Sequence, residues 1–174
     1  MLTRKYRFTV IAVAVILSGW ILYEQVYELA AVVFAGIAYL IWGYYKQGTV
    51  VLAAKAYHHK DYEKAALLLK EIKDPDRLAA NRRGYYEFIS GNIELQQQNF
   101  EEAERHFQIA SKFPLKNQND KAIVLVQLAN LNLKKKDFDK ASAYSARARE
   151  LKISSRVENI IEKIEREIQK QGDQ

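Results

Sequence analysis

The chain has 174 residues, a formal net charge of +6 and no cysteine. The lack of cysteine excludes disulfide frameworks, thiol catalysis and cysteine-based zinc sites. Charge is divided unevenly, because residues 1–46 hold six charged side chains and residues 47–174 hold the others, 23 Lys/Arg against 19 Asp/Glu. Acidic residues stand among the basic ones throughout this second part, so no basic stripe indicates nucleic-acid binding. Solvated surface explains the basic excess, with attraction to anionic lipid as the alternative.

Two apolar runs without a charged residue stand near the N-terminus, at about residues 8–23 and 29–45. As helices they would each span roughly 24–26 Å, at the short end for a hydrocarbon core of about 30 Å. Flanking tyrosines and tryptophans can act as interfacial anchors. The intervening residues 24–28 include two carboxylates, which suit a turn outside the bilayer. We therefore predict that residues 1–46 form a hairpin of two transmembrane helices in the lipid bilayer.

Basic residues set the expected orientation of this hairpin. Arg4, Lys5 and Arg7 precede the first run, Lys46 follows the second, and the turn has no Lys or Arg. The positive-inside rule then places both termini, and the rest of the chain, in the cytoplasm. The size of the chain and the absence of an organelle transit pattern favour a bacterial inner membrane. A cleaved signal peptide is one alternative, although no small-x-small cleavage signal follows the first run. A hairpin lying in the membrane interface is the other.

One phrase recurs three times at a spacing of 38 residues in the following part of the chain. Its aromatic members are Tyr62, Phe100 and Phe138, each followed three residues later by alanine. A fixed period in this range is typical of stacked supersecondary units, which present a binding surface rather than a catalytic pocket. Alanine lets two antiparallel helices approach closely, and the aromatic side chain is expected to fill the space beside it.

Each unit is predicted to be a pair of helices, so the expected fold class is all-α. Asp61 can cap the second helix of the first pair, and Asp120 the first helix of the third. Pro75 and Pro114 end the first two units, because proline cannot continue the hydrogen bonding of a helix. The three pairs are expected within about residues 49–72, 76–114 and 119–151, with helices at 49–59 and 62–72, 77–97 and 100–113, and 120–135 and 138–151.

Residues 154–174 depart from the repeated pattern. Ser155 and Glu158 have the spacing of a capping box. The apolar residues that follow fall on one stripe, and Glu, Lys and Arg cover the other side. We expect a helix that closes the stack of repeats in residues 47–153, with a coiled-coil dimer helix as the alternative, although it has only about two heptads. The stripe consists of Val157, Ile160, Ile161, Ile164 and Ile168.

The repeats resemble the tetratricopeptide repeat (TPR) family over about residues 49–153. The third unit has Ala129 in place of the family's glycine and Ser145 in place of a large residue, and the first unit is the weakest match. The family's usual period of 34 residues is shorter than this one by about one helical turn. The resemblance implies a three-repeat α-solenoid that binds other proteins, and it does not name the partner. The best match is the second unit, with Gly91, Phe100, Ala103, Phe107, Ala110 and Pro114 at or within one residue of the family's signature positions.

The same resemblance implies that the first helix of each pair lines a groove for a peptide or a helix. Asn92 and Asn130 occur one period apart, and their amides can hydrogen-bond a peptide backbone, unless both are ordinary helix-surface residues. Phe88 and Val126 stand where some family members have a lysine that clamps a terminal carboxylate, so such a ligand is not expected. The apolar content suits an amphipathic helix or a hydrophobic segment. The groove residues carried over by position are Tyr57, His58, Tyr85, Phe88, Asn92, Gln96, Ile123, Val126, Asn130 and Lys134.

No constellation indicates catalysis, a metal site or a cofactor. His58 and His59 are adjacent, so they point about 100° apart on a helix and chelate poorly. His106 has no carboxylate arrangement nearby in sequence, and all three histidines are expected on the solvated surface. No phosphate-binding glycine motif is present. The sequence thus predicts a membrane-anchored adaptor that binds a protein or peptide segment, with a self-associating structural protein as the alternative and an enzyme as the least favoured class.

Overall fold

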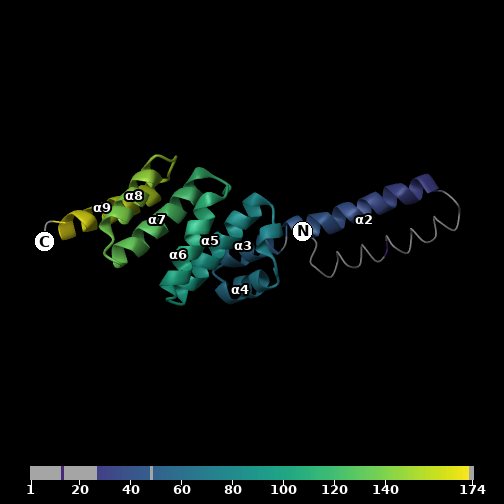
Figure 1. The fold of residues 1–174 in the computed structure, drawn as a ribbon, viewed down its shortest axis with the longest axis horizontal. Coiled ribbons are helices and arrows are strands. Elements are labelled where there is room, and N and C mark those ends of the chain that lie inside the picture. Colours follow the sequence, from purple (N-terminus) through teal and green to yellow (C-terminus); the bar gives the residue numbers. More distant parts are fainter. Residues whose placement is uncertain (1–12, 14–26, 48, 173–174) are drawn as a thin grey trace. The chain divides into compact units, whose positions relative to one another are not determined.

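The computed structural model describes residue 13, residues 27–47 and residues 49–172 of the chain (Figure 1). Helices are the only regular elements in these ranges apart from one 3-10 turn, and they contain no strand. The all-α fold class is therefore confirmed. The chain divides into two compact units, Met1–Lys46 and Gln47–Gln174, and each is described by itself.

The first unit contributes one described helix, α2 (Tyr27–Gln47), which extends one residue beyond it. Large apolar side chains along this helix are exposed, among them Val32 at 70% and Trp42 at 58%. The second predicted span lies within α2, whereas the first span, the basic N-terminal residues and most of the predicted turn lie outside the described residues. Among the helices that the structure describes, none combines the length and the hydropathy needed to cross a membrane.

The second unit consists of three helix pairs and a final helix, which follow one another in chain order (Figure 1). The first pair is α3 (Val50–His58) and α4 (Tyr62–Lys70). A 3-10 turn, η1 (Pro75–Arg77), precedes the second pair, α5 (Ala80–Gln96) and α6 (Phe100–Lys112). The third pair is α7 (Gln118–Lys134) and α8 (Phe138–Arg149), and α9 (Ser155–Gly172) follows.

The recurring phrase marks the turn inside each pair. The residues Lys60, Gln98 and Lys136 have positive φ angles of 61°, 63° and 60°, the left-handed conformation that commonly ends a helix. After each of them, the next backbone N–H donates to the carbonyl five residues earlier, at 2.9–3.0 Å. Asp61 and Asp137 then cap α4 and α8 by accepting from a backbone N–H three residues on, at 3.1 and 3.2 Å. The 38-residue period therefore repeats a local turn geometry.

One expectation about local structure was wrong. The N-cap of α7 is Asn117, whose side chain accepts from the Asp120 N–H at 2.7 Å, so the helix begins two residues before the expected one. The aromatic residues of the phrase are only partly buried, because Phe100 is 36% exposed and Tyr62 and Phe138 are half-buried. The Tyr62 ring packs between the two helices of the first pair, with its centroid 5.7 Å from that of Tyr57 on α3. The three alanines of the phrase, Ala65, Ala103 and Ala141, are fully buried.

The two helices of the second pair approach each other closely at Gly91. A Cβ added to this residue would lie 2.9 Å from the ring of Phe107, which is fully buried in the main hydrophobic core. Real Cβ atoms are essentially never that close to another atom, so α5 and α6 can pack at this distance only with glycine in this position. The glycine that resembles the family's signature thus has a packing reason in this chain.

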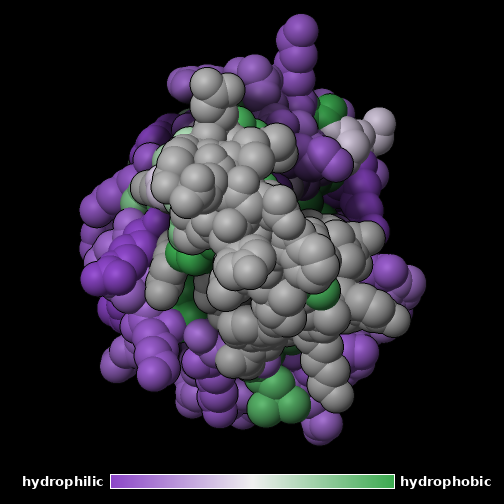
Figure 2. Space-filling model, turned by 90° about the vertical axis from the view of Figure 1, so that its right-hand side faces the viewer, coloured by the Kyte–Doolittle hydropathy of each residue, from purple (hydrophilic) through white to green (hydrophobic). Residues whose placement is uncertain are grey.

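The final helix α9 covers α7 and α8. Its residues Val157, Ile161 and Ile164 are buried in a cluster with both helices. Arg149 on α8 donates two hydrogen bonds to the Glu165 carboxylate on α9, at 2.9 and 2.6 Å. The apolar stripe is therefore used within the chain, which favours the closing helix over a coiled coil. Since α9 begins at Ser155 itself, this residue is not the helix cap. Outside the grey residues, the surface in Figure 2 is mostly hydrophilic, with isolated hydrophobic residues.

Candidate binding groove

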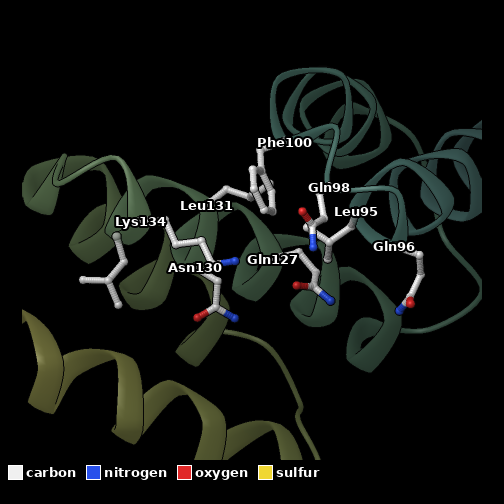
Figure 3. Close-up of a pocket in the computed structure, with 9 residues that line it drawn as sticks. Leu95, Gln96, Gln98, Phe100, Gln127, Asn130, Leu131 and Lys134 are labelled. Atoms are coloured by element: carbon white, nitrogen blue, oxygen red, sulfur yellow. The ribbon is translucent and has the colours of Figure 1, made fainter.

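A groove with a volume of about 440 Å³ lies beside α7, where the end of α5 turns into α6 (Figure 3). The end of α5 contributes two residues, the turn one, the start of α6 one, and α7 five. The groove is formed by helices of two successive pairs, so the stacking of the repeats creates it. The lining residues are Leu95, Gln96, Gln98, Phe100, Gln127, Asn130, Leu131, Leu133 and Lys134.

Apolar side chains form the inner part of the groove. Leu131 is buried, while Leu95 and Leu133 are half-buried and Phe100 is partly exposed. Figure 3 shows the Phe100 ring beside Leu131. Burying such surface against a ligand is favourable, at about 25 cal/mol for each Å² removed from water. The groove therefore offers an apolar contact that is only partly used within the chain.

Four carboxamide groups surround this apolar part, from Gln96, Gln98, Gln127 and Asn130. None of the four side chains has a hydrogen-bond partner among the described residues. Each carboxamide carries two N–H donors and one carbonyl acceptor. Together they form a set of uncommitted donors and acceptors next to an apolar surface, which is the usual composition of a binding site.

The groove has one charged group, the ammonium of Lys134. Its Nζ lies 4.4 Å from the centroid of the Phe100 ring, in a cation–π contact. No described carboxylate lies within 4.0 Å of it, in contrast to the neighbouring Lys135, which pairs with Glu104 at 2.5 Å. The lining thus carries a single, unpaired positive charge.

Three of the residues expected in the groove line it, namely Gln96, Asn130 and Lys134. The aromatic ones instead pack together, with ring centroids 5.9 Å apart for Tyr57 and Phe88 and 6.3 Å apart for Tyr85 and Phe88. These edge-to-face contacts belong to the core between the first two pairs. The remaining expected residues do not line the groove. Val126 and Ile123 lie on α7 and pack in the hydrophobic core, and His58 is exposed on α3.

Tyr85 joins α5 to the start of α7. Its hydroxyl donates a hydrogen bond to the Asp120 carboxylate. Burial raises the pKa of Tyr85 well above its ordinary value, and the hydrogen bond to Asp120 adds to the rise. The phenol therefore stays protonated over the physiological range and serves as a donor between two pairs.

The structure places Asn92 and Asn130 in different environments. Asn92 is 9% exposed, and its side-chain nitrogen donates to the Phe88 carbonyl at 2.7 Å within α5. Asn130 is half-exposed and lines the groove. The two asparagines occupy the same position in the period, yet only Asn130 has an amide available to a ligand.

The sequence-based prediction of the groove missed Gln98, Phe100 and Gln127. Gln98 and Phe100 lie at the turn and at the start of the second helix, and Phe100 was expected to be scaffold. The sequence does contain an indication for Gln127, because it is the only polar residue between Ile123 and Ala129. An uncharged polar side chain within such an apolar run indicates a position that faces out of the core.

A second polar cluster lies inside the α5–α6 interface. Glu87 is 2% exposed and contacts the guanidinium of Arg83 at 2.9 Å and the Nδ1 atom of His106. Arg83 also reaches Asp76 at 3.3 Å. The expectation that His106 is a solvated surface residue was wrong, because the packing of α6 on α5 brings it to a carboxylate 19 residues away. In the ranges that the structure describes, no group of His, Asp and Glu is arranged to hold a metal ion.

Comparisons of the chain with protein-family models, with curated proteins and with solved structures gave no match.

Proposed function

We propose that this chain is a membrane-anchored adaptor with TPR-like repeats, whose groove holds a segment of another protein at the cytoplasmic face of a bacterial inner membrane. The observation that carries the proposal is the set of four unpaired carboxamides around the apolar groove. A binding role suits an array of helix pairs, because each pair contacts its neighbours and leaves a continuous surface between them.

The chemistry of the lining favours an extended polypeptide as the ligand. The backbone of an extended segment presents N–H and C=O groups without partners, and carboxamides can both donate to it and accept from it. A helix has already paired these groups internally, so it would leave the four amides of the groove unsatisfied. An extended segment with an apolar side chain directed at Leu131 and Phe100 uses both parts of the groove.

The membrane part of the proposal is supported by the sequence. The runs at residues 8–23 and 29–45 have no charge, and basic residues flank them on the same predicted side. The exposed apolar side chains of α2 are consistent with a lipid environment. A hairpin would keep the repeats next to the membrane, so the cytoplasmic segment of a membrane protein is a suitable ligand.

Site-specific photo-crosslinking in native membranes tests the adaptor. A photoreactive amino acid replaces Gln127 in the groove of the full-length chain, and in the control it replaces Ser142, which is exposed on α8. The proposal expects a product with a different protein from position 127 only. The same products from both positions would contradict it, and a product containing only a second copy of the chain would favour self-association instead.

A protease accessibility assay tests the orientation separately. Protease added outside spheroplasts should leave residues 47–174 intact, and it should digest them after the membrane is opened. Removal of the repeats from intact spheroplasts would show that the cytoplasmic assignment is wrong.

A further inference from the structure

A row of four aromatic rings fills the junction between the first two helix pairs. Tyr57 on α3 contacts Tyr62 on α4, with ring centroids 5.7 Å apart, and Phe88 on α5, at 5.9 Å. Phe88 in turn contacts Tyr85 at 6.3 Å. All three contacts are edge to face, the arrangement that aromatic pairs prefer. The rings therefore connect α3, α4 and α5 directly.

The groove lies at the equivalent junction of the second and third pairs, where only one of these rings is kept. Phe100 stands one period after Tyr62, and no other ring of the described residues contacts it. The two first helices are also less closely packed here, because α5 and α7 make fewer contacts than α3 and α5 do. The groove is therefore open where aromatic rings are missing. The aliphatic residues Leu95, Val126 and Ile123 stand one period after Tyr57, Phe88 and Tyr85.

Exposure at the two junctions shows the same difference. Ile89 is fully buried at the first junction, whereas Gln127, one period later, is half-exposed and lines the groove. Phe100 and Leu95 line the groove too, and the Phe100 ring is 36% exposed (Figure 3). With a volume of about 440 Å³, the groove is large enough for the side chain of a ligand. A partly exposed ring is thus available next to a space that a second ring can enter.

We propose that the extended segment held in the groove carries an aromatic side chain, which packs on Phe100 in the place that the Tyr57 ring takes on Tyr62. The inference rests on the proposed function and names the side chain that the groove recognises. The Lys134 ammonium, 4.4 Å from the centroid of the Phe100 ring, is close enough to attract the incoming ring as well. The carboxamides around the apolar part remain available to the backbone of the segment. The first junction, closed by the chain's own rings, is the internal model of the occupied groove.

Synthetic peptide pools test which side chain is preferred. Each pool contains nonapeptides of random sequence with one fixed residue at the centre, and it is applied to the immobilised full-length chain in mild detergent. The pools with central Phe, Tyr or Trp should be retained about two- to tenfold more than the pool with central Leu, because an aromatic pair adds to the gain from apolar burial. Equal retention of the aromatic and leucine pools would contradict the proposal.

Two substitutions in the groove show whether the preference arises there. Leu95→Tyr supplies the missing ring from the chain itself, so retention of the aromatic pools should fall to that of the leucine pool. Leu67→Tyr is the matched control, because it makes the same change at a residue of α4 that is 66% exposed and outside the groove. Phe100→Leu removes the receiving ring and should also abolish the preference. Circular dichroism should show the same helicity for all three variants. A full aromatic preference in Leu95→Tyr and in Phe100→Leu would overturn the proposal.

The outcomes separate this inference from the proposed function. If position 127 gives its crosslinked partner in native membranes and the pools show no aromatic preference, or none is retained, the aromatic side chain is wrong and the adaptor stands. If position 127 gives no partner and no pool is retained, the adaptor is wrong, and the inference that rests on it is wrong too.

Discussion

The α5–α6 interface and the groove beside α7 both contain polar side chains, but their hydrogen bonding differs. In the interface, Glu87 has an arginine and a histidine as partners, and Asn92 bonds to its own helix. In the groove, the amides of Gln127 and Asn130 have no described partner. Polar groups that are already paired contribute to the fold, and those left unpaired at a surface are free to bind. The difference separates residues that stabilise this protein from residues that we expect to bind its partner.

The largest effect is expected from removing the buried carboxylate. Glu87→Ala leaves the Arg83 guanidinium and His106 without their partner inside the interface, so it should lower the free energy of unfolding by about 3–5 kcal/mol. Urea denaturation of the full-length chain in mild detergent, followed by circular dichroism, measures the loss. Glu101→Ala, at an exposed position of α6, is the control and should change little. A loss for Glu87→Ala no larger than the roughly 1 kcal/mol of a surface pair would show that the cluster does not stabilise the interface.

Gly91→Ala should destabilise the same interface without removing a charge. The new Cβ would lie 2.9 Å from the Phe107 ring, which is fully buried. We expect a loss of about 1–3 kcal/mol from overpacking, measured in the same denaturation experiment. Combining it with Phe107→Leu should give a double variant more stable than the sum of the two single effects, because the smaller side chain leaves room for the methyl group. Strict additivity of the two changes would mean that this contact is not the cause.

Binding should respond to the groove and not to the interface. Gln127→Ala with Asn130→Ala removes two uncommitted amides, so partner capture should weaken by about tenfold, at roughly 0.5–1.5 kcal/mol for each hydrogen bond lost. The free energy of unfolding should stay unchanged, because neither side chain has a partner within the described chain. Asn92→Ala is the matched control and should have the reverse pattern, with some loss of stability and normal capture. Quantitative pull-down from crosslinked membranes compares both variants with the unchanged chain. Equal loss of capture in Asn92→Ala would mean that the distinction between the two asparagines is wrong.

The smallest effect is expected at the turns, which lie outside both regions. Lys136 adopts a left-handed conformation at φ 60°, which glycine adopts without strain. Lys136→Gly should therefore raise the free energy of unfolding by about 0.5–1 kcal/mol. Lys135→Gly, one residue earlier at φ −78°, should lower it instead. A stabilisation by both glycines, or by neither, would show that backbone strain at the turn is not what the substitution relieves.

The sequence predicted most of what depends on neighbouring residues. The all-α class is confirmed, and α4, α6 and α8 begin at Tyr62, Phe100 and Phe138, because the turn before each helix is encoded within a few residues. The contact of His106 with Glu87 was not predicted, because it depends on how α5 and α6 pack. The separation of Asn92 from Asn130 was also missed, because the period assigns them the same position and only burial distinguishes them. Gln98 and Phe100 were missed because they lie on the turn and on α6, and the prediction considered only the first helix of each pair.

The closing helix α9 has a consequence for assembly. Copies of a repeat array can polymerise head to tail only when both ends of the stack present unsatisfied apolar surface. Here α9 covers the C-terminal end with buried isoleucines and turns charged residues outward. The array therefore has a fixed number of repeats, and an open filament of copies joined through this end is blocked. Any self-association has to use a surface other than this end of the stack.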